Sequence, residues 1–457
     1  MARFSKRCTL PVAPAEAFAW HARPGALERL LPPWQRVRVL ERSADGLAEG
    51  TRVALELRWG PLRSRWIARH RAVEADRSFV DEQEHGPFAT WRHTHRFLPG
   101  EGGCVLEDEV EYGLPLGPLG AVLGGRAVQR ALKRTFSFRH ARTAADLVRH
   151  HRTAGERRHV VVTGASGLIG AALTAFLRSG GHRVTTLVRR RPREGWDEAF
   201  WDPSAGAVDA AALEGADAVV HLAGENIGGG RWTAARRRSI LDSRVRGTEL
   251  LAHTLAGLAH PPPVLVAASA VGFYGDRGRE EVDEDTGPGR GFLADVCRAW
   301  EQACAPASEA GLRVVNARFG MVLSASGGAL ARMLPAFRAG LGGPMGRGEQ
   351  AVSWVALDDA VGAVLFAISK ATVAGPVNVV APGAVSNRDL ARSLGRVLRR
   401  PARLPVPGPA IRLAFGAMGD ELLLAGARVR PGRLQAAGFT FLYPALEAAL
   451  RLELGRL

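Results

Sequence analysis

Lysine is almost absent from this chain of 457 residues and occurs only at Lys6, Lys133 and Lys370. The formal net charge of +16 therefore comes almost entirely from arginine. Nucleic-acid-binding proteins typically gather their basic residues in one stripe, together with aromatic residues. Here the arginines are distributed along the chain, so we interpret the charge as a basic surface and expect no nucleic-acid partner.

Cysteines and long apolar runs are also scarce. The four cysteines, Cys8, Cys104, Cys297 and Cys304, show neither metal-site spacing nor a disulfide framework, so we expect no bound metal. No apolar run reaches the length of a membrane span. The first residues lack the apolar core and cleavage site of a signal peptide. These absences predict a cytoplasmic protein without a membrane span and leave its oligomeric state open.

The most informative stretch is HVVVTGASGLIG, residues 159–170. A short β-branched run precedes Gly164, Gly167 and Gly170, and apolar residues at helical spacing follow them. Strand, glycine turn and helix in this order are typical of a dinucleotide-binding fingerprint. Glycines let a pyrophosphate approach the backbone, and the helix N-terminus offers free N–H groups to the phosphates. A purely structural turn is the alternative interpretation.

The second strand of this unit, 182–189, predicts which cofactor binds. Proteins that prefer NAD usually carry an acidic residue at its end, which holds the ribose 2′-hydroxyl. Here Arg189, Arg190 and Arg191 occupy that place. A guanidinium group suits a 2′-phosphate, so we predict NADP(H), with a solvated basic loop as the alternative.

The pattern of elements predicts three segments. Residues 1–152 begin with a strand and two short helical pieces, continue with several period-two strands, and close with a long helix. Residues 151–158 are polar and are interpreted as a short linker. Residues 159–400 alternate strand and helix, which predicts a doubly wound parallel sheet of the α/β class. Residues 401–457 are apolar and mostly helical, so we expect them to pack against another part of the chain.

The order of elements in 1–152, and its opening phrase LPVAPAEAFAWHARPGALERLLPPW, resemble the α+β helix-grip fold of the START and polyketide-cyclase-like (SRPBCC) superfamily. The resemblance implies a cavity between a curved sheet and a long helix that holds an apolar ligand. The alternative is a filled core with a scaffolding role.

The phrases VTGASGLIG, HLAG, ASAVGFYG and SWVALDDAVGA resemble the extended short-chain dehydrogenase/reductase and sugar-epimerase superfamily, with a Rossmann-type fold. Longer phrases resemble an atypical epimerase-like family, some of whose members carry the label cell-division inhibitor. The resemblance implies that the cofactor is contacted by Gly164, Ser166, Gly167, Leu168, Ile169, Gly170, Arg189, Leu222, Ala223, Gly224 and Arg244. A surface arginine is the alternative for Arg244.

The superfamily's Tyr-x-x-x-Lys pair is missing. Leu293 and Cys297 align with the tyrosine and the lysine, and Ala270 falls at the serine position, with Ser269 one residue away. Cys297 is interpreted as a buried apolar thiol. Candidates for proton transfer are Tyr274 as a neutral acid, Glu225 as a base, and Ser269. A packed aromatic and a capping residue are the alternatives for Tyr274 and Glu225.

Three functions therefore remain open. The first is an NADP(H)-dependent oxidoreductase or epimerase-like enzyme acting on an unidentified small substrate, with an apolar molecule as one option. The second is a regulatory or scaffold protein that binds the nucleotide without turnover. The third is a lipid or isoprenoid carrier that uses residues 1–152.

Overall fold

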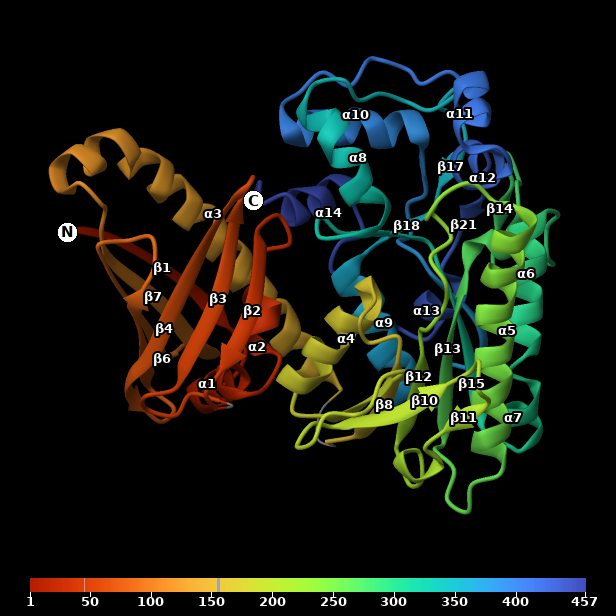
Figure 1. Cartoon of the computed structure of the whole chain (residues 1–457), viewed down its shortest axis with the longest axis horizontal. Coiled ribbons are helices and arrows are strands. Elements are labelled where there is room, and N and C mark those ends of the chain that lie inside the picture. Colours follow the sequence, from red (N-terminus) through yellow and green to blue (C-terminus); the bar gives the residue numbers. More distant parts are fainter. Residues whose placement is uncertain (45, 154–156) are drawn as a thin grey trace. The chain divides into compact units, whose positions relative to one another are not determined.

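The computed structural model describes residues 1–44, 46–153 and 157–457 (Figure 1). The chain divides into two compact units. Unit 1 comprises Met1–Glu156, Ala175–Gly181 and Leu452–Leu457, and unit 2 comprises Arg157–Thr174 and His182–Arg451. Part of the expected linker, residues 154–156, lies outside the described residues.

Unit 1 is built on a seven-stranded antiparallel sheet in the order β1-β7-β6-β5-β4-β3-β2. Its strands are β1 (Ala2–Leu10), β2 (Arg36–Arg42), β3 (Arg52–Trp59), β4 (Leu62–Glu74), β5 (Ser78–His85), β6 (Thr90–Gly100) and β7 (Gly103–Gly113). Its helices are α1 (Pro14–Ala22), α2 (Ala26–Leu30) and the long α3 (Gly117–Arg152). The expected helix-grip architecture is confirmed.

Alternation along the strands of unit 1 places every second side chain inside. On β6, His93, His95 and Phe97 are buried while the residues between them are partly exposed. Phe97 belongs to an apolar core shared by strands and helices, with Leu10, Trp20 and Leu147. Between α2 and α3, the guanidinium of Arg29 donates to both carboxylate oxygens of Asp146 at 2.6 and 2.7 Å, and both side chains are buried.

Unit 2 is a Rossmann-type domain, as expected. Its main sheet has the order β11-β10-β9-β8-β12-β13-β15-β19, and all its strands are parallel except β11. The strands are β8 (His159–Thr163), β9 (Arg183–Val188), β10 (Glu198–Asp202), β11 (Ala207–Val208), β12 (Ala218–His221), β13 (Val264–Ala270), β15 (Arg313–Phe319) and β19 (Gly375–Val379). The strand order reverses between β8 and β12. In such sheets ligands bind at the carboxyl ends of the strands beside this reversal.

Helices cover both faces of this sheet (Figure 1). They include α4 (Leu168–Ser179), α5 (Ala234–Ala256), α6 (Phe292–Gln302), α7 (Ala305–Glu309) and α9 (Leu357–Ser369). The helices α8 (Gly328–Arg338) and α10 (Asn387–Leu398) contact each other. The helical stretch 292–309 is divided into α6 and α7, with Pro306 in the first turn of α7. The edge strands β10 and β11 were not expected, because they are short and lack clear alternation.

The C-terminal segment is tied to unit 2 by buried hydrogen bonds. The backbone N–H groups of Leu442 and Tyr443 donate to the buried Asp359 carboxylate on α9, at 2.7 and 2.9 Å. Ser353 bonds the backbone of Ala427 and Val429. The segment contains α11 (Gly408–Phe415), α12 (Ala417–Gly419), a π-helical turn (Asp420–Leu424), α13 (Gly432–Ala436) and α14 (Leu446–Glu453). Short strands pair as β14 (Glu281–Val282) with β21 (Arg428–Val429), β16 (Met321–Leu323) with β18 (Trp354–Ala356), and β17 (Ala351–Val352) with β20 (Val385–Ser386).

A membrane-spanning helix was not expected. Across the described ranges, no helix combines the length and the apolar character needed to cross a bilayer.

The Arg29–Asp146 pair allows a test of the unit 1 core. Arg29→Met leaves a buried carboxylate without its cation, so we expect the free energy of unfolding to fall by about 3–5 kcal/mol. Adding Asp146→Leu removes the uncompensated charge and should restore most of the loss. Chemical denaturation of both variants measures this. Arg71→Gln, which alters an exposed pair with Glu82, is the control and should change little.

Candidate functional site

The glycine turn after β8 lies against the turn after β12. Gly164 has a φ of +68°, and a Cβ there would lie 2.7 Å from the backbone of Leu222 and Ala223. A Cβ on Gly170 would lie 2.2 Å from the carbonyl oxygen of Gly164. These two glycines are therefore required by close backbone packing, which brings the two turns together at the reversal point of the sheet.

Gly167 has a different role from its neighbours. It is exposed, its φ is not positive, and a Cβ there would meet only the Gly164 oxygen, at 3.2 Å. Ser166 beside it is also exposed, and α4 begins at Leu168 with Ile169 in its first turn. The first N–H groups of a helix lack partners within it. This open turn at a helix N-terminus fits a pyrophosphate, so the residues present are compatible with a bound dinucleotide.

Arg244, on α5, contacts the turn that follows β12. It is buried, which excludes the surface alternative, and its Nη1 donates to the carbonyl oxygens of Glu225 and Ile240 at 3.1 Å. A Cβ on Gly224 would lie 3.3 Å from its guanidinium carbon. Burial lowers the pKa of Arg244 from its ordinary value. Arg244 therefore holds in place the backbone of the turn after β12, residues 221–226.

Glu225 is the most accessible of the three predicted proton-transfer residues. Its side chain is 40% exposed, and it forms an ion pair with Arg236 at 2.7 Å. Its backbone N–H donates to Ser243. The carboxylate is therefore partly accessible, and it belongs to the turn after β12.

Tyr274 and Ser269 belong instead to a buried network. The Tyr274 hydroxyl donates to Asn378 at 2.8 Å and accepts from Arg318 at 2.9 Å. Arg318 also donates twice to Glu301 at 2.8 Å, and the Ser269 hydroxyl donates to the same carboxylate at 2.6 Å. Burial raises the pKa of Tyr274, although the adjacent Arg318 guanidinium acts in the opposite direction. These contacts favour the packed-aromatic interpretation of Tyr274.

The position of the missing catalytic pair is apolar. A Cβ added at Gly272 would lie 3.3 Å from Leu293 and 3.8 Å from Cys297, which are both on α6. Cys297 is buried, and burial raises the pKa of its thiol to about 11. Cys297 is therefore a buried neutral thiol, as interpreted from the sequence.

Arg189 lies at the end of β9 and is exposed. Its neighbour Arg190 pairs with Glu198 at 2.6 Å, and Arg193 pairs with the same carboxylate. Within the described part of the chain, Arg189 forms no ion pair, although its charge helps to lower the pKa of Asp202. Arg189 is therefore available to an anionic ligand, whereas Arg190 is already engaged.

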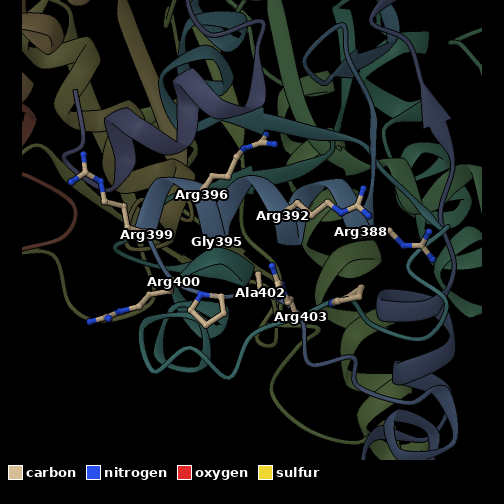
Figure 2. Close-up of a pocket in the computed structure, with 10 residues that line it drawn as sticks. Arg388, Arg392, Gly395, Arg396, Arg399, Arg400, Ala402 and Arg403 are labelled. Atoms are coloured by element: carbon tan, nitrogen blue, oxygen red, sulfur yellow. The ribbon is translucent and has the colours of Figure 1, made fainter.

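A separate cavity of about 700 Å³ lies along α10 (Figure 2). Figure 2 shows arginines projecting from α10 and from the segment that follows it. They are Arg388, Arg392, Arg396, Arg399, Arg400 and Arg403. None of the predicted site residues lines this arginine groove. The sequence interpretation treated the arginines as distributed and overlooked this local concentration, which attracts anions.

Sequence reasoning also missed several buried polar residues. Arg318 and Asn378 lie on strands of the main sheet, and only their contacts, with residues far along the chain, identify them. In unit 1, His93 and His95 are buried side by side, with ring centroids 3.9 Å apart. The sequence WRHTHRF already indicates that the two histidines lie on the same face, because residues two apart on a strand share a face.

Three families match the chain. Residues 160–381 match the NAD dependent epimerase/dehydratase family, and residues 10–136 match the family described as polyketide cyclase / dehydrase and lipid transport. Residues 406–452 match a domain of unknown function. Both resemblances inferred from the sequence are thereby confirmed.

Relatives cover most of unit 2. An epimerase family protein of Mycobacterium bovis is 45% identical over 293 residues, which is 64% of this chain and 96% of the relative. The human epimerase family protein SDR39U1 is 37% identical over 64% of this chain and 98% of its own length.

Two solved structures are similar to this chain. A nucleoside-diphosphate sugar epimerase from Corynebacterium glutamicum has a TM-score of 0.82 at 35% identity, covering 99% of this chain and 90% of that one. Human SDR39U1, crystallised with NADPH, has a TM-score of 0.60 at 35% identity, covering 65% of this chain and 100% of that one.

The Tyr274 network leads to a stability prediction. Tyr274→Phe removes the partner of two buried polar groups, Asn378 and Arg318, so we expect unfolding to become easier by about 1–3 kcal/mol. Chemical denaturation measures the change. Phe441→Leu, at a partly buried aromatic of the C-terminal segment, is a packing control without a hydroxyl. An unchanged stability for Tyr274→Phe would show that its hydroxyl is not needed in the core.

Proposed function

The chain belongs to the NAD dependent epimerase/dehydratase family, and we propose that unit 2 binds NADP(H) and transfers hydride to or from a small substrate. The main support for this proposal is the close contact between the turns that follow β8 and β12. Gly164 and Gly170 are fixed by backbone packing, while the exposed Gly167 leaves space at the helix N-terminus where phosphates bind. A turn with only a structural role needs no such opening.

The choice of NADP(H) is supported by Arg189. It is exposed at the end of β9, where an acidic residue would mark NAD, and it is not held by Glu198 as Arg190 is. Human SDR39U1, a relative over the same region, was crystallised with NADPH. Arg189 would therefore contact the 2′-phosphate.

Proton transfer is assigned to Glu225. When bound, the nicotinamide would supply or accept the hydride. The carboxylate of Glu225 would take a proton from a substrate hydroxyl as hydride leaves, or return it in the reverse step. Glu225 would have to release only its partly exposed ion pair with Arg236, whereas Tyr274 would have to break two buried hydrogen bonds. The chain carries no Tyr-x-x-x-Lys pair at the usual position.

Two other functions remain in competition. A regulatory or scaffold protein would bind NADPH without consuming it in the presence of any substrate. Carriage of an apolar ligand by unit 1 is compatible with its helix-grip fold and its match to a family described in terms of lipid transport. A ligand that copurifies with the chain would favour carriage. Consumption of NADPH with a carbonyl or enone substrate favours the enzyme.

Cofactor preference is the first test. The unmodified chain should bind NADPH more tightly than NADH, and Arg189→Asp should reduce NADPH affinity by about 10–100-fold because a charge-assisted phosphate contact is lost. Calorimetric titration measures both nucleotides. Arg183→Gln, at the opposite end of β9, is the matched control and should retain the preference. Gly167→Val should abolish binding of both nucleotides. Equal affinities in the unmodified chain would contradict the assignment.

Proton transfer is the second test. Once a substrate is found in a carbonyl and enone panel, Glu225→Gln should slow single-turnover hydride transfer by about 10²–10⁴-fold. Nicotinamide absorbance follows the reaction, and NADPH affinity should be unchanged. Asp242→Asn, at a carboxylate on α5, is the control. If Tyr274→Phe alone gives the large loss, the role moves to Tyr274.

A further inference from the structure

The interior of unit 1 contains a cluster of ionisable side chains where its family resemblance implied an apolar cavity. They come from four neighbouring strands and two helices and are His21, His70, Asp81, His93, His95, Asp108 and His140. All are buried except Asp81, whose side chain is 25% exposed. Buried groups of this kind are costly unless they are paired or bind a metal.

Three of these side chains converge on one point. Asp81 on β5 lies opposite His93 on β6, and His95 follows on the same face of β6. Asp81 Oδ2 is 3.4 Å from His95 Nε2 and 3.9 Å from His93 Nδ1. One ligand atom from each residue lies within 4.8 Å of the others. Ligand atoms of a tetrahedral zinc site lie about 3.3–3.5 Å apart, so small side-chain shifts are sufficient.

The opposite edges of the two imidazoles are held by one carboxylate. Asp108 on β7 lies 2.9 Å from His93 Nε2 and 2.7 Å from His95 Nδ1, and its other oxygen bonds His140 Nε2. Metal-binding histidines usually donate their second N–H group to a carboxylate, which fixes the tautomer and the ring orientation. Asp108 therefore directs His93 Nδ1 and His95 Nε2 towards Asp81.

Unsatisfied polar atoms provide an independent observation. Among the described residues, Asp81 Oδ1 and both ring nitrogens of His95 are buried without a hydrogen bond of acceptable geometry, although Asp108 lies 2.7 Å from His95 Nδ1. Phe79 stacks on His95 with ring centroids 4.0 Å apart, so the ring cannot turn freely to find another partner. Buried polar atoms of a native protein normally have a partner, or an ion or water takes that place.

A proton is the alternative occupant of this position. Burial acts against charge on His95, yet the carboxylates of Asp108 and Asp81 raise its pKa to about 9. Burial lowers the pKa of His93 to about 4, and lowers that of His21 to about 4. The Arg139 guanidinium on α3 also faces the two carboxylates. A protonated, metal-free cluster is therefore the outcome that the experiment must exclude.

We propose that Asp81, His93 and His95 bind a divalent transition-metal ion of the zinc class, with Asp108 as the residue that positions both histidines. Two nitrogens and one oxygen suit zinc and cobalt rather than magnesium or calcium, which prefer oxygen ligands. Three protein ligands leave a fourth position for water or a ligand. His70 lies beside this group, with its Nε2 3.8 Å from Asp81. This site belongs to unit 1 and is independent of the nucleotide site proposed for unit 2.

The test uses the full chain, freed of any affinity tag and stripped with a chelator. Titration calorimetry and elemental analysis should show one Zn²⁺ bound per chain, and Co²⁺ should give the visible absorption bands of a tetrahedral site. Mg²⁺ and Ca²⁺ should not compete. A stripped chain that binds no Zn²⁺ and gives no cobalt spectrum would overturn the proposal, whatever the variants do.

Variants identify the ligands. His93→Gln and His95→Gln should abolish the cobalt spectrum, while Asp108→Asn should weaken metal affinity by about 10–100-fold with the spectrum altered rather than lost. His85→Gln, at an exposed histidine of the same sheet, is the control. Zn²⁺ should raise the melting temperature of the unmodified chain and of the control, raise that of Asp108→Asn by less, and leave those of His93→Gln and His95→Gln unchanged. An unchanged cobalt spectrum in both ligand variants would place the metal elsewhere and contradict the assignment.

Discussion

The geometry of the nucleotide site depends on a contact between two backbone segments, one at Gly164 and the other at Leu222 and Ala223. Gly164 lies so close to the Leu222–Ala223 peptide that a single Cβ would overlap it, at 2.7 Å. This contact brings the turns after β8 and β12 together where the strand order reverses. Arg244 stabilises the turn after β12 by donating a hydrogen bond to the carbonyl oxygen of Glu225. The opening at Gly167 and the accessible Glu225 carboxylate both depend on this arrangement.

The sequence predicted the parts of the molecule that depend on local patterns. Alternation predicted the sheet of unit 1, and the glycine spacing predicted the turn at Gly164 because close packing restricts that position to glycine. Pairings between distant residues were not accessible in this way. The sequence left Tyr274 open between a proton donor and a packed aromatic, and only its contacts with Arg318 and Asn378, far along the chain, distinguish the two. A helical stretch is also divided where a proline intervenes, as at Pro306.

Two of the buried polar clusters differ in how far their hydrogen bonds are satisfied. In unit 2, Arg318 and Glu301 form an ion pair with two bonds of 2.8 Å, and Ser269 and Tyr274 complete the hydrogen bonds around it. The groups around this pair are largely satisfied, which suits a structural role. In unit 1, polar atoms of Asp81 and His95 remain without partners although they are buried. An unsatisfied cluster is a candidate for binding, whereas a satisfied one stabilises the fold.

Native mass spectrometry of the intact chain tests directly for the NADP(H) site, because it detects bound nucleotide without requiring a known substrate. After incubation with an equal mixture of NADPH and NADH, we expect one added mass per chain, that of NADPH. A spectrum that shows only the unliganded chain, or an equal population of both nucleotides, would contradict the proposed NADP(H) site at Gly167 and Arg189.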